Sequence, residues 1–136
     1  MRAVVDTGVF ISALIKRQGT TGDVLLALRD GRFNMIYTTD ILVEIIDVLG
    51  RPAFRSKYHI EPDDITALVN LIRLRGDLVT SQRKITACRD PKDDKFLEAA
   101  LAAGADCIVS GDADLLDVSS LENIPVLRPA EFLARL

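Results

Sequence analysis

Short apolar runs alternate with longer amphipathic stretches along the whole chain. Ala3–Val5 is apolar throughout and ends at an acidic residue, which is typical of a strand buried on both faces. Between Ile41 and Leu49, apolar residues recur with the 3.6-residue period of a helix that buries one face. The same patterns predict strands over 3–5, 33–37, 78–80, 107–109 and 126–127, and helices over 9–15, 23–29, 39–49, 62–72, 93–103 and 130–136.

This alternation predicts an α/β fold, a three-layer α/β/α domain with a mostly parallel sheet. Right-handed crossovers follow from that topology. Thr38 or Thr39 is expected to cap the helix that ends at Leu49. The basic segment 53–60 is expected to be a loop. A length of 136 residues fits one domain, which we expect to span residues 1–136.

Composition narrows the class of protein without identifying a function. Apolar residues make up 49% and charged residues 27%, as in a soluble globular domain, and only 5% are aromatic, so we expect an aliphatic core. The net charge of −3 gives no bulk attraction to nucleic acid, although it does not exclude such binding. Cys88 and Cys107 do not indicate a disulfide framework. We see no secretory signal and no apolar run near the ~20 residues that span a bilayer, so we expect a cytoplasmic protein.

Four acids stand where a parallel α/β fold gathers side chains at one edge. Asp6 and Asp112 each follow a predicted strand, Asp93 opens a predicted helix, and Glu44 lies one turn into another. In open parallel sheets, ligands bind beyond the carboxyl ends of the strands. The sequence therefore predicts that these four carboxylates converge on one cleft.

Such a cluster needs compensation. Two unit charges ~4 Å apart repel by ~1 kcal/mol in bulk water and by ~4 kcal/mol at an effective dielectric constant near 20. Either some of the acids are protonated or a cation lies among them. Mg²⁺ and Mn²⁺ prefer oxygen ligands, whereas no Cys or His spacing favours zinc, so we predict a Mg²⁺ or Mn²⁺ site.

Each acid also has a purely structural interpretation. Asp6 could cap a turn, and Asp112 could be an ordinary turn acid. Glu44 shares a helical face with other acids and could belong to a solvated polar surface. Asp93 and its neighbour Asp94 could simply cap a helix. The joint arrangement is more informative than any one member.

Together the segments that carry these acids resemble the PIN domain family, and the closest resemblance is to single-domain toxins of the VapC group. The resemblance covers nearly the whole chain and rests on Glu44 and on the segments 6–13 (DTGVFISA), 90–100 (DPKDDKFLEAA) and 108–116 (IVSGDADLL).

The resemblance implies a parallel five-stranded sheet and a Mg²⁺- or Mn²⁺-dependent ribonuclease. It assigns the four family acids to Asp6, Glu44, Asp93 and Asp112, as catalytic and metal-binding residues, with Asp94 an alternative for the third. It also implies a small antitoxin partner and pairing of the chain with itself as a homodimer.

One position departs from the pattern that the resemblance implies. The family usually has Asp-Thr-Asn at its first motif, whereas here Gly8 follows Thr7. A polar side chain near the site is lost, which puts full activity in doubt. Thr7 and Ser110 fit positions where the family commonly has small hydroxyl residues near the metal, and Asp114 could assist from farther out.

The functional hypothesis is hydrolysis of phosphodiester bonds in single-stranded RNA. Basic residues near the cleft could hold the RNA backbone, and Phe54 or Tyr58 could stack on bases. The lone histidine, His59, is expected at the surface. The basic candidates are Lys16, Arg17, Arg51, Arg55, Lys57, Lys92 and Lys95.

Other classes of protein compete with this hypothesis, and the sequence argues against most of them. A phosphatase of the HAD type needs a second acid at position 8, which is Gly8, and a receiver domain needs an acidic pair that Met1–Asp6 lacks. A dinucleotide site is disfavoured because no glycine-rich loop follows the first strand. Gly8 keeps open one further alternative, a PIN-like module that binds RNA or a partner protein without cleaving anything.

Overall fold

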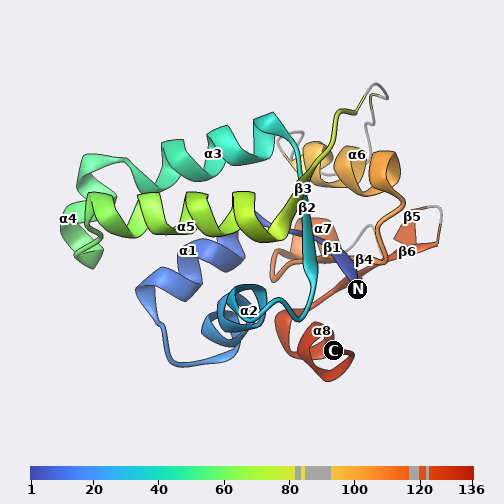
Figure 1. The fold of residues 1–136 in the computed structure, drawn as a ribbon, viewed down its shortest axis with the longest axis horizontal. Coiled ribbons are helices and arrows are strands. Elements are labelled where there is room, and N and C mark those ends of the chain that lie inside the picture. Colours follow the sequence, from blue (N-terminus) through green and yellow to red (C-terminus); the bar gives the residue numbers. More distant parts are fainter. Residues whose placement is uncertain (82–83, 85–92, 117–119, 122) are drawn as a thin grey trace.

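The computed structural model spans residues 1–136 and describes residues 1–81, 84, 93–116, 120–121 and 123–136. Strands and helices alternate along the chain (Figure 1). In chain order the elements are β1 (Arg2–Val5), α1 (Thr7–Ile15), α2 (Thr20–Arg29), β2 (Asn34–Tyr37), α3 (Thr39–Leu49), α4 (Pro52–Tyr58), α5 (Pro62–Arg75), β3 (Gly76–Leu78), α6 (Asp94–Ala103), β4 (Cys107–Val109), α7 (Ala113–Leu116), β5 (Ser120–Leu121), β6 (Ile124–Leu127) and α8 (Pro129–Ala134).

The strands form one sheet in the order β3-β2-β1-β4-β6-β5. β3, β2, β1, β4 and β6 pair in parallel, and the two-residue β5 adds to β6 in the antiparallel sense. The predicted α/β fold with a mostly parallel five-stranded sheet is therefore confirmed, with β5 as an unpredicted edge strand.

The strand order reverses beside β1. The chain passes from β1 to β2 and β3 on one side, then returns to β4 on the other side. Val5 pairs with Val109, and the Asp6 amide donates to the Val109 carbonyl at 2.9 Å, so β1 and β4 end level with each other. Since a crevice opens outside the carboxyl ends of the strands at such a reversal, the fold itself marks this edge as a binding site.

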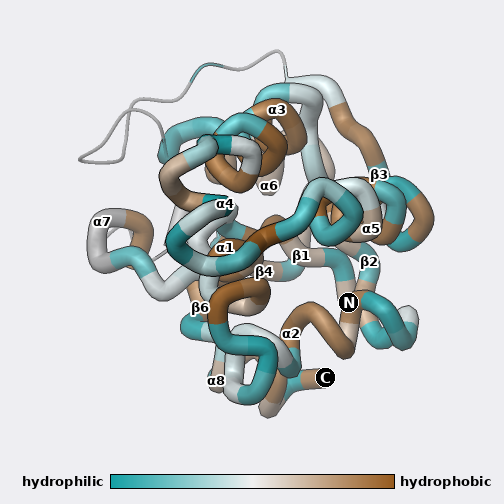
Figure 2. Tube along the Cα trace, turned by 90° about the vertical axis from the view of Figure 1, so that its left-hand side faces the viewer, coloured by the Kyte–Doolittle hydropathy of each residue, from teal (hydrophilic) through white to brown (hydrophobic). Residues whose placement is uncertain are grey.

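Helices cover both faces of the sheet. α6 packs on β1, β2 and β4, whereas α2 contacts both α5 and α8 on the other side (Figure 1). α3 and α5 show alternating apolar and polar turns, the amphipathic pattern of helices with one face buried (Figure 2). The three-layer arrangement follows from burying these apolar stripes against a sheet that is apolar on both faces.

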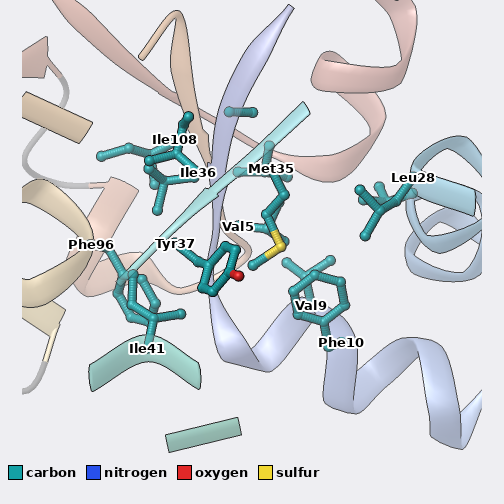
Figure 3. Packing of buried hydrophobic residues seen from close by; sticks show 14 of the residues in the cluster. Val5, Val9, Phe10, Leu28, Met35, Ile36, Tyr37, Ile41, Phe96 and Ile108 are labelled. Carbon is teal, nitrogen blue, oxygen red and sulfur yellow. The ribbon is translucent and has the colours of Figure 1, made fainter. Parts of the chain in front are cut away.

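The core lies on both faces of the central strands. Successive residues of β2, Met35 and Ile36, point to opposite sides, as the two-residue period of a strand requires (Figure 3). Aromatic residues contribute more than the composition suggested, because Phe10, Phe96 and Phe132 are among the largest fully buried side chains. The expectation of an aliphatic core is thus only partly right.

Residues 53–60 differ from prediction, because Pro52–Tyr58 forms α4 instead of a loop. Pro52 occupies the first helical turn, where its missing N–H costs nothing, and the helix ends at His59 in the left-handed conformation. Phe54 and Tyr58, four residues apart, pack ring to ring at 4.8 Å.

β3 begins two residues earlier than predicted, directly after α5. A Cβ at Gly76 would lie 2.5 Å from the Ile72 carbonyl oxygen and 2.8 Å from Tyr37 Cε1. Only glycine lets the chain turn from helix to strand at this point.

The described residues contain no helix with the length and apolar composition needed to cross a membrane. Cys107 is buried as a free thiol, and Cys88 lies outside the described residues.

Candidate active site at the ends of the central strands

A cleft of about 480 Å³ opens at the reversal of strand order. Three of the four predicted acids line it: Asp6 from the end of β1, Glu44 from α3, and Asp112 from the segment after β4. Thr7, Ser12 and Thr21 add hydroxyl groups to the walls. The structure therefore brings together carboxylates from three distant parts of the sequence, as the topology predicts.

Asp6 forms the buried floor of this cleft, with 8% of the residue exposed. It is the N-cap of α1, and its Oδ1 accepts a hydrogen bond from the Gly8 amide at 3.2 Å. Its Oδ2 accepts from Ser110 Oγ at 2.8 Å. Asp6 therefore caps a helix, as its structural interpretation holds, and also presents a carboxylate to the cleft.

The Ser110 hydroxyl connects two of the acids. Ser110 is fully buried, and its Oγ accepts a hydrogen bond from the Asp112 amide at 2.9 Å while donating to Asp6. Asp112 itself is an exposed residue that lines the cleft. One hydroxyl thus fixes the backbone that carries Asp112 relative to the carboxylate of Asp6.

Glu44 is held between two neighbouring elements. Thr7 Oγ1 donates to Glu44 Oε2 at 2.5 Å, and Lys95 Nζ lies 3.0 Å from Glu44 Oε1. Thr38 caps α3 by accepting from the Ile41 amide, which sets the helical phase that turns Glu44 toward the cleft and Ile41 and Ile45 into the core. The interpretation of Glu44 as a purely solvated acid does not agree with these contacts.

Asp93 and Asp94 lie at the start of α6, the helix that also carries Lys95. Asp93 is the N-cap residue and is half-buried, whereas Asp94 is the first helical residue and is only 6% exposed. The Lys95–Glu44 pair brings this end of α6 next to α3. Neither aspartate lines the cleft as the structure has it, so the choice between them remains a prediction.

Burial makes the largest contribution to the pKa of Asp6. Loss of water raises the pKa of its carboxyl group, the hydrogen bonds from Ser110 and Gly8 lower it, and the charges of Asp112 and Glu44 raise it again. The net result is a raised pKa, because two hydrogen bonds do not offset burial and two like charges. A cation placed among these three acids would reverse the repulsion and favour the ionised form of Asp6.

The donor chemistry of the cleft fits a hard divalent cation, since every acidic ligand offered is a carboxylate oxygen. The geometry is not that of a completed site: within the described ranges, no three His, Cys, Asp or Glu side chains are close enough to surround an ion. Both Glu44 oxygens are engaged by Thr7 and Lys95. The carboxylates are therefore suitable ligands in kind, and an ion bound to Glu44 would share that carboxylate with the Lys95 ammonium, whose charge would repel it.

Sequence reasoning missed some of the surroundings of the cleft. Ser12 is detectable in retrospect because it lies one helical turn after Gly8 on α1, whereas Thr21 and Pro129 reach the cleft only through tertiary packing. Lys95 was expected to contact RNA, not Glu44. The remaining basic candidates are placed as follows: Lys16 is the exposed C-cap residue of α1, Arg17 pairs with Asp64, Arg51 pairs with Asp47, Arg55 donates to the Ile60 carbonyl, Lys57 lies over the Tyr58 ring, and Lys92 is outside the described residues.

Comparison with known proteins agrees with the geometry. The sequence pattern of the family described as "PIN domain" matches residues 2–114, a range that includes all four predicted acids. An uncharacterized protein, MJ1680 of Methanocaldococcus jannaschii, is 30% identical over 118 residues, which cover 87% of this chain and 75% of that protein.

A solved structure shares the fold at much lower identity. It is the crystal structure of VapBC2 from Rickettsia felis bound to a DNA fragment from their promoter. The similarity has a TM-score of 0.60 at 13% identity and covers 94% of this chain and 98% of the matched chain. With the family pattern matched over most of its length and an acid-lined cleft at the predicted edge of the sheet, this chain belongs to the PIN domain family.

Proposed function

We propose that this protein is a metal-dependent endoribonuclease that hydrolyses phosphodiester bonds of single-stranded RNA with Mg²⁺ or Mn²⁺ as cofactor. The observation that carries the proposal is the convergence of Asp6, Glu44 and Asp112 on one cleft at the switch point of the sheet. Membership of the PIN domain family supports nuclease activity as the use of this acidic cleft.

Each residue has a role that follows from its contacts. Asp6, Glu44 and Asp112, with Asp93 or Asp94, would hold one or two divalent cations. Such an ion, when bound, supplies a water of lowered pKa and positive charge for the phosphoryl oxygens.

Ser110 and Thr7 orient the Asp6 and Glu44 carboxylates through hydrogen bonds of 2.8 and 2.5 Å, which limits the reorganisation that binding requires. The attacking oxygen comes from water, so no protein nucleophile is needed.

Cleavage of a mixed set of RNA oligonucleotides tests this function. We expect cutting with Mn²⁺, none with EDTA, and a loss of at least about 100-fold in Asp6→Asn, which keeps the shape of the side chain and removes its charge. Asp63→Asn is the matched control, because Asp63 is an exposed acid in the first turn of α5. Cutting that survives both EDTA and Asp6→Asn would refute the proposal.

The third acid can be assigned with a pair of adjacent variants. We propose Asp93, as the family pattern implies, although Asp94 is the more buried of the two. Asp93→Asn and Asp94→Asn should be compared for Mn²⁺ affinity and for thermal stability without metal. The metal ligand is the residue whose substitution weakens Mn²⁺ binding without loss of stability. An acid that only stabilises the end of the helix would instead lose stability on substitution and leave Mn²⁺ binding unchanged.

A small antitoxin is the proposed partner, with the chain as the toxin of the pair acting in the cytoplasm as a homodimer. The shared fold with VapBC2 from Rickettsia felis supports this proposal at the level of architecture. Expression of the chain should arrest bacterial growth, and expression of Asp6→Asn should not. Light scattering should give twice the mass of 14.9 kDa that one chain has. If the chain cleaves RNA but its expression does not affect bacterial growth, the toxin role is contradicted and the nuclease activity is not.

A second candidate is a catalytically impaired module that binds RNA or a protein. Gly8 favours it, because this position leaves the wall beside Asp6 without a side chain. RNA binding that is insensitive to Asp6→Asn, with no cleavage at any Mn²⁺ concentration, would select this candidate over the nuclease.

A further inference from the structure

A second polar cavity of about 200 Å³ lies at the same edge of the sheet, and we call it the α3–β3 cavity. It opens where β2 passes into α3 and where the chain leaves β3. Its walls carry four hydroxyl groups and two ammonium groups, contributed by Thr38, Thr39, Thr80, Ser81, Lys84 and Lys95.

Lys95 is the boundary between this cavity and the acidic cleft. Its Nζ lies 3.0 Å from Glu44 Oε1, and the same side chain lines the α3–β3 cavity. The Lys95 side chain is 19% exposed, and its Nζ lies 5.4 Å from the centre of the Phe96 ring. The ammonium group of Lys95 therefore lies between the acidic cleft and the α3–β3 cavity.

The cavity offers hydrogen-bond donors of the kind that bind phosphate. Lysine ammonium groups and hydroxyls bind phosphate oxygens, and the start of α3 adds the positive end of a helix dipole. Asp40 and Glu98 also line the cavity, so among the described residues that form its walls the carboxylates equal the ammonium groups in number. Binding there must depend on directed donors such as Lys84 and not on an excess of positive charge.

The spacing of the two sites matches a polynucleotide chain. Neighbouring strands are ~4.8 Å apart, so a cavity beyond β2 and β3 lies ~5–10 Å along the sheet edge from a cleft beyond β1 and β4. The backbone of a single strand covers such a distance in one or two nucleotides. We infer that the α3–β3 cavity binds a phosphate of the RNA next to the one that is cleaved, with Lys84 and Lys95 as its cationic ligands.

This inference rests on the proposed function, since it assumes that the scissile phosphate binds in the acidic cleft. Its test uses RNA binding without cleavage, measured by fluorescence anisotropy with a labelled ten-nucleotide RNA and the Asp6→Asn protein. Lys84→Gln is added to that background because Lys84 lines the cavity and not the cleft. Arg29→Gln is the matched control, since it removes an exposed cation from α2.

Salt dependence gives the sharpest readout. Loss of one phosphate contact should reduce the slope of log affinity against log KCl concentration by about 0.7 and weaken binding about eightfold at 50 mM KCl. We expect these changes for Lys84→Gln and none for Arg29→Gln. Equal slopes for Lys84→Gln and its parent, or no RNA binding by the parent, would overturn the inference.

The outcome is separable from that of the proposed function. Metal-dependent cleavage by the native chain with an unchanged slope in Lys84→Gln would leave the nuclease standing and remove the phosphate subsite. A reduced slope in a chain that never cleaves RNA would keep the subsite and remove the nuclease.

Discussion

Lys95 Nζ lies 3.0 Å from Glu44 Oε1, so an ammonium group of α6 contacts the carboxylate that α3 contributes to the acidic cleft. Both side chains are mostly shielded from solvent, with 19% and 26% exposed, which strengthens their attraction relative to a surface pair. In the absence of metal, Lys95 supplies part of the positive charge that the acidic cleft requires. A metal ion bound in the acidic cleft would therefore compete with this ammonium group for Glu44.

This competition predicts opposite effects of Lys95→Gln on stability and on metal binding. We expect the free energy of unfolding without metal to fall by about 1–2 kcal/mol, because Glu44 loses its partner. Affinity for Mn²⁺ should rise several-fold in calorimetry, because the competing cation is gone. Arg51→Gln, which breaks the exposed Arg51–Asp47 pair, should change both quantities little. Unchanged Mn²⁺ affinity in Lys95→Gln would argue against the competition.

The raised pKa of Asp6 makes the acidic cleft a source of instability at neutral pH. An acid whose pKa is higher in the folded state than in the unfolded state costs stability when it ionises, and acidification through that folded pKa relieves the cost. Asp6→Asn should therefore raise the melting temperature in EDTA at pH 7, which differential scanning calorimetry would measure. The gain should shrink as the pH falls toward 4.

Asp64 provides a control, because its pKa is shifted in the opposite direction to that of Asp6. The hydrogen bond from the Glu61 amide, aided by Arg17, lowers the pKa of Asp64. Its ionised form therefore adds stability at neutral pH, and that stability is lost as the pH falls through the lowered pKa. Asp64→Asn should lower the melting temperature at pH 7. A loss of stability in Asp6→Asn similar to that in Asp64→Asn would show that burial does not dominate at Asp6.

Gly8 has room for the side chain that the family pattern places there. A Cβ at this position would lie 3.7 Å from Asp6 Oδ2, an ordinary contact distance. Gly8→Asn should fold normally and place an amide beside the predicted metal ligands, raising the rate of RNA cleavage about 10-fold. Gly111→Asn adds the same side chain elsewhere in the cleft, where a Cβ meets nothing within 4 Å, and should not raise the rate. Slower RNA cleavage by Gly8→Asn would mean that the absence of a side chain at position 8 favours activity in this protein.

Gly22 is required for packing, although it lies inside a helix. A Cβ there would lie 2.0 Å from the Arg17 carbonyl oxygen in the segment between α1 and α2. Alanine normally stabilises a helix relative to glycine by about 0.5–1 kcal/mol, but Gly22→Ala should lose about 2–3 kcal/mol in urea unfolding because backbone must move. Gly111→Ala should lie within about 0.5 kcal/mol of the native chain. A stabilised Gly22→Ala would contradict this prediction.

Much of the fold was predictable because local pattern and tertiary structure agree in the centre of the sheet. Ala3–Val5 in β1 and Cys107–Val109 in β4 are continuous apolar runs followed by polar residues, and Thr38 precedes the amphipathic stripe of α3 in the manner of an N-cap. Parallel topology then places Asp6 and Asp112 at one edge without further information. Three of the four acids line the cleft for this reason.

The rest depends on contacts that no local rule specifies. The pairing of Lys95 with Glu44 joins two helices that are distant in sequence, and the hydrogen bond from Ser110 to Asp6 spans 104 positions. α4 was missed because Pro52 ends one helix and starts another, and periodicity cannot distinguish these uses. Sequence patterns predicted which acids meet, but not which cation and hydroxyls hold them.

The level ends of β1 and β4 have a consequence for motion. These strands are the innermost of the sheet and are buried from Ala3 to Val5 and from Cys107 to Val109, and the Asp6 amide donates a hydrogen bond to the Val109 carbonyl. Amides so protected exchange hydrogen only when the whole domain opens. The base of the acidic cleft is therefore expected to be rigid, so the adjustments that ligand binding requires would occur in the helices around its rim.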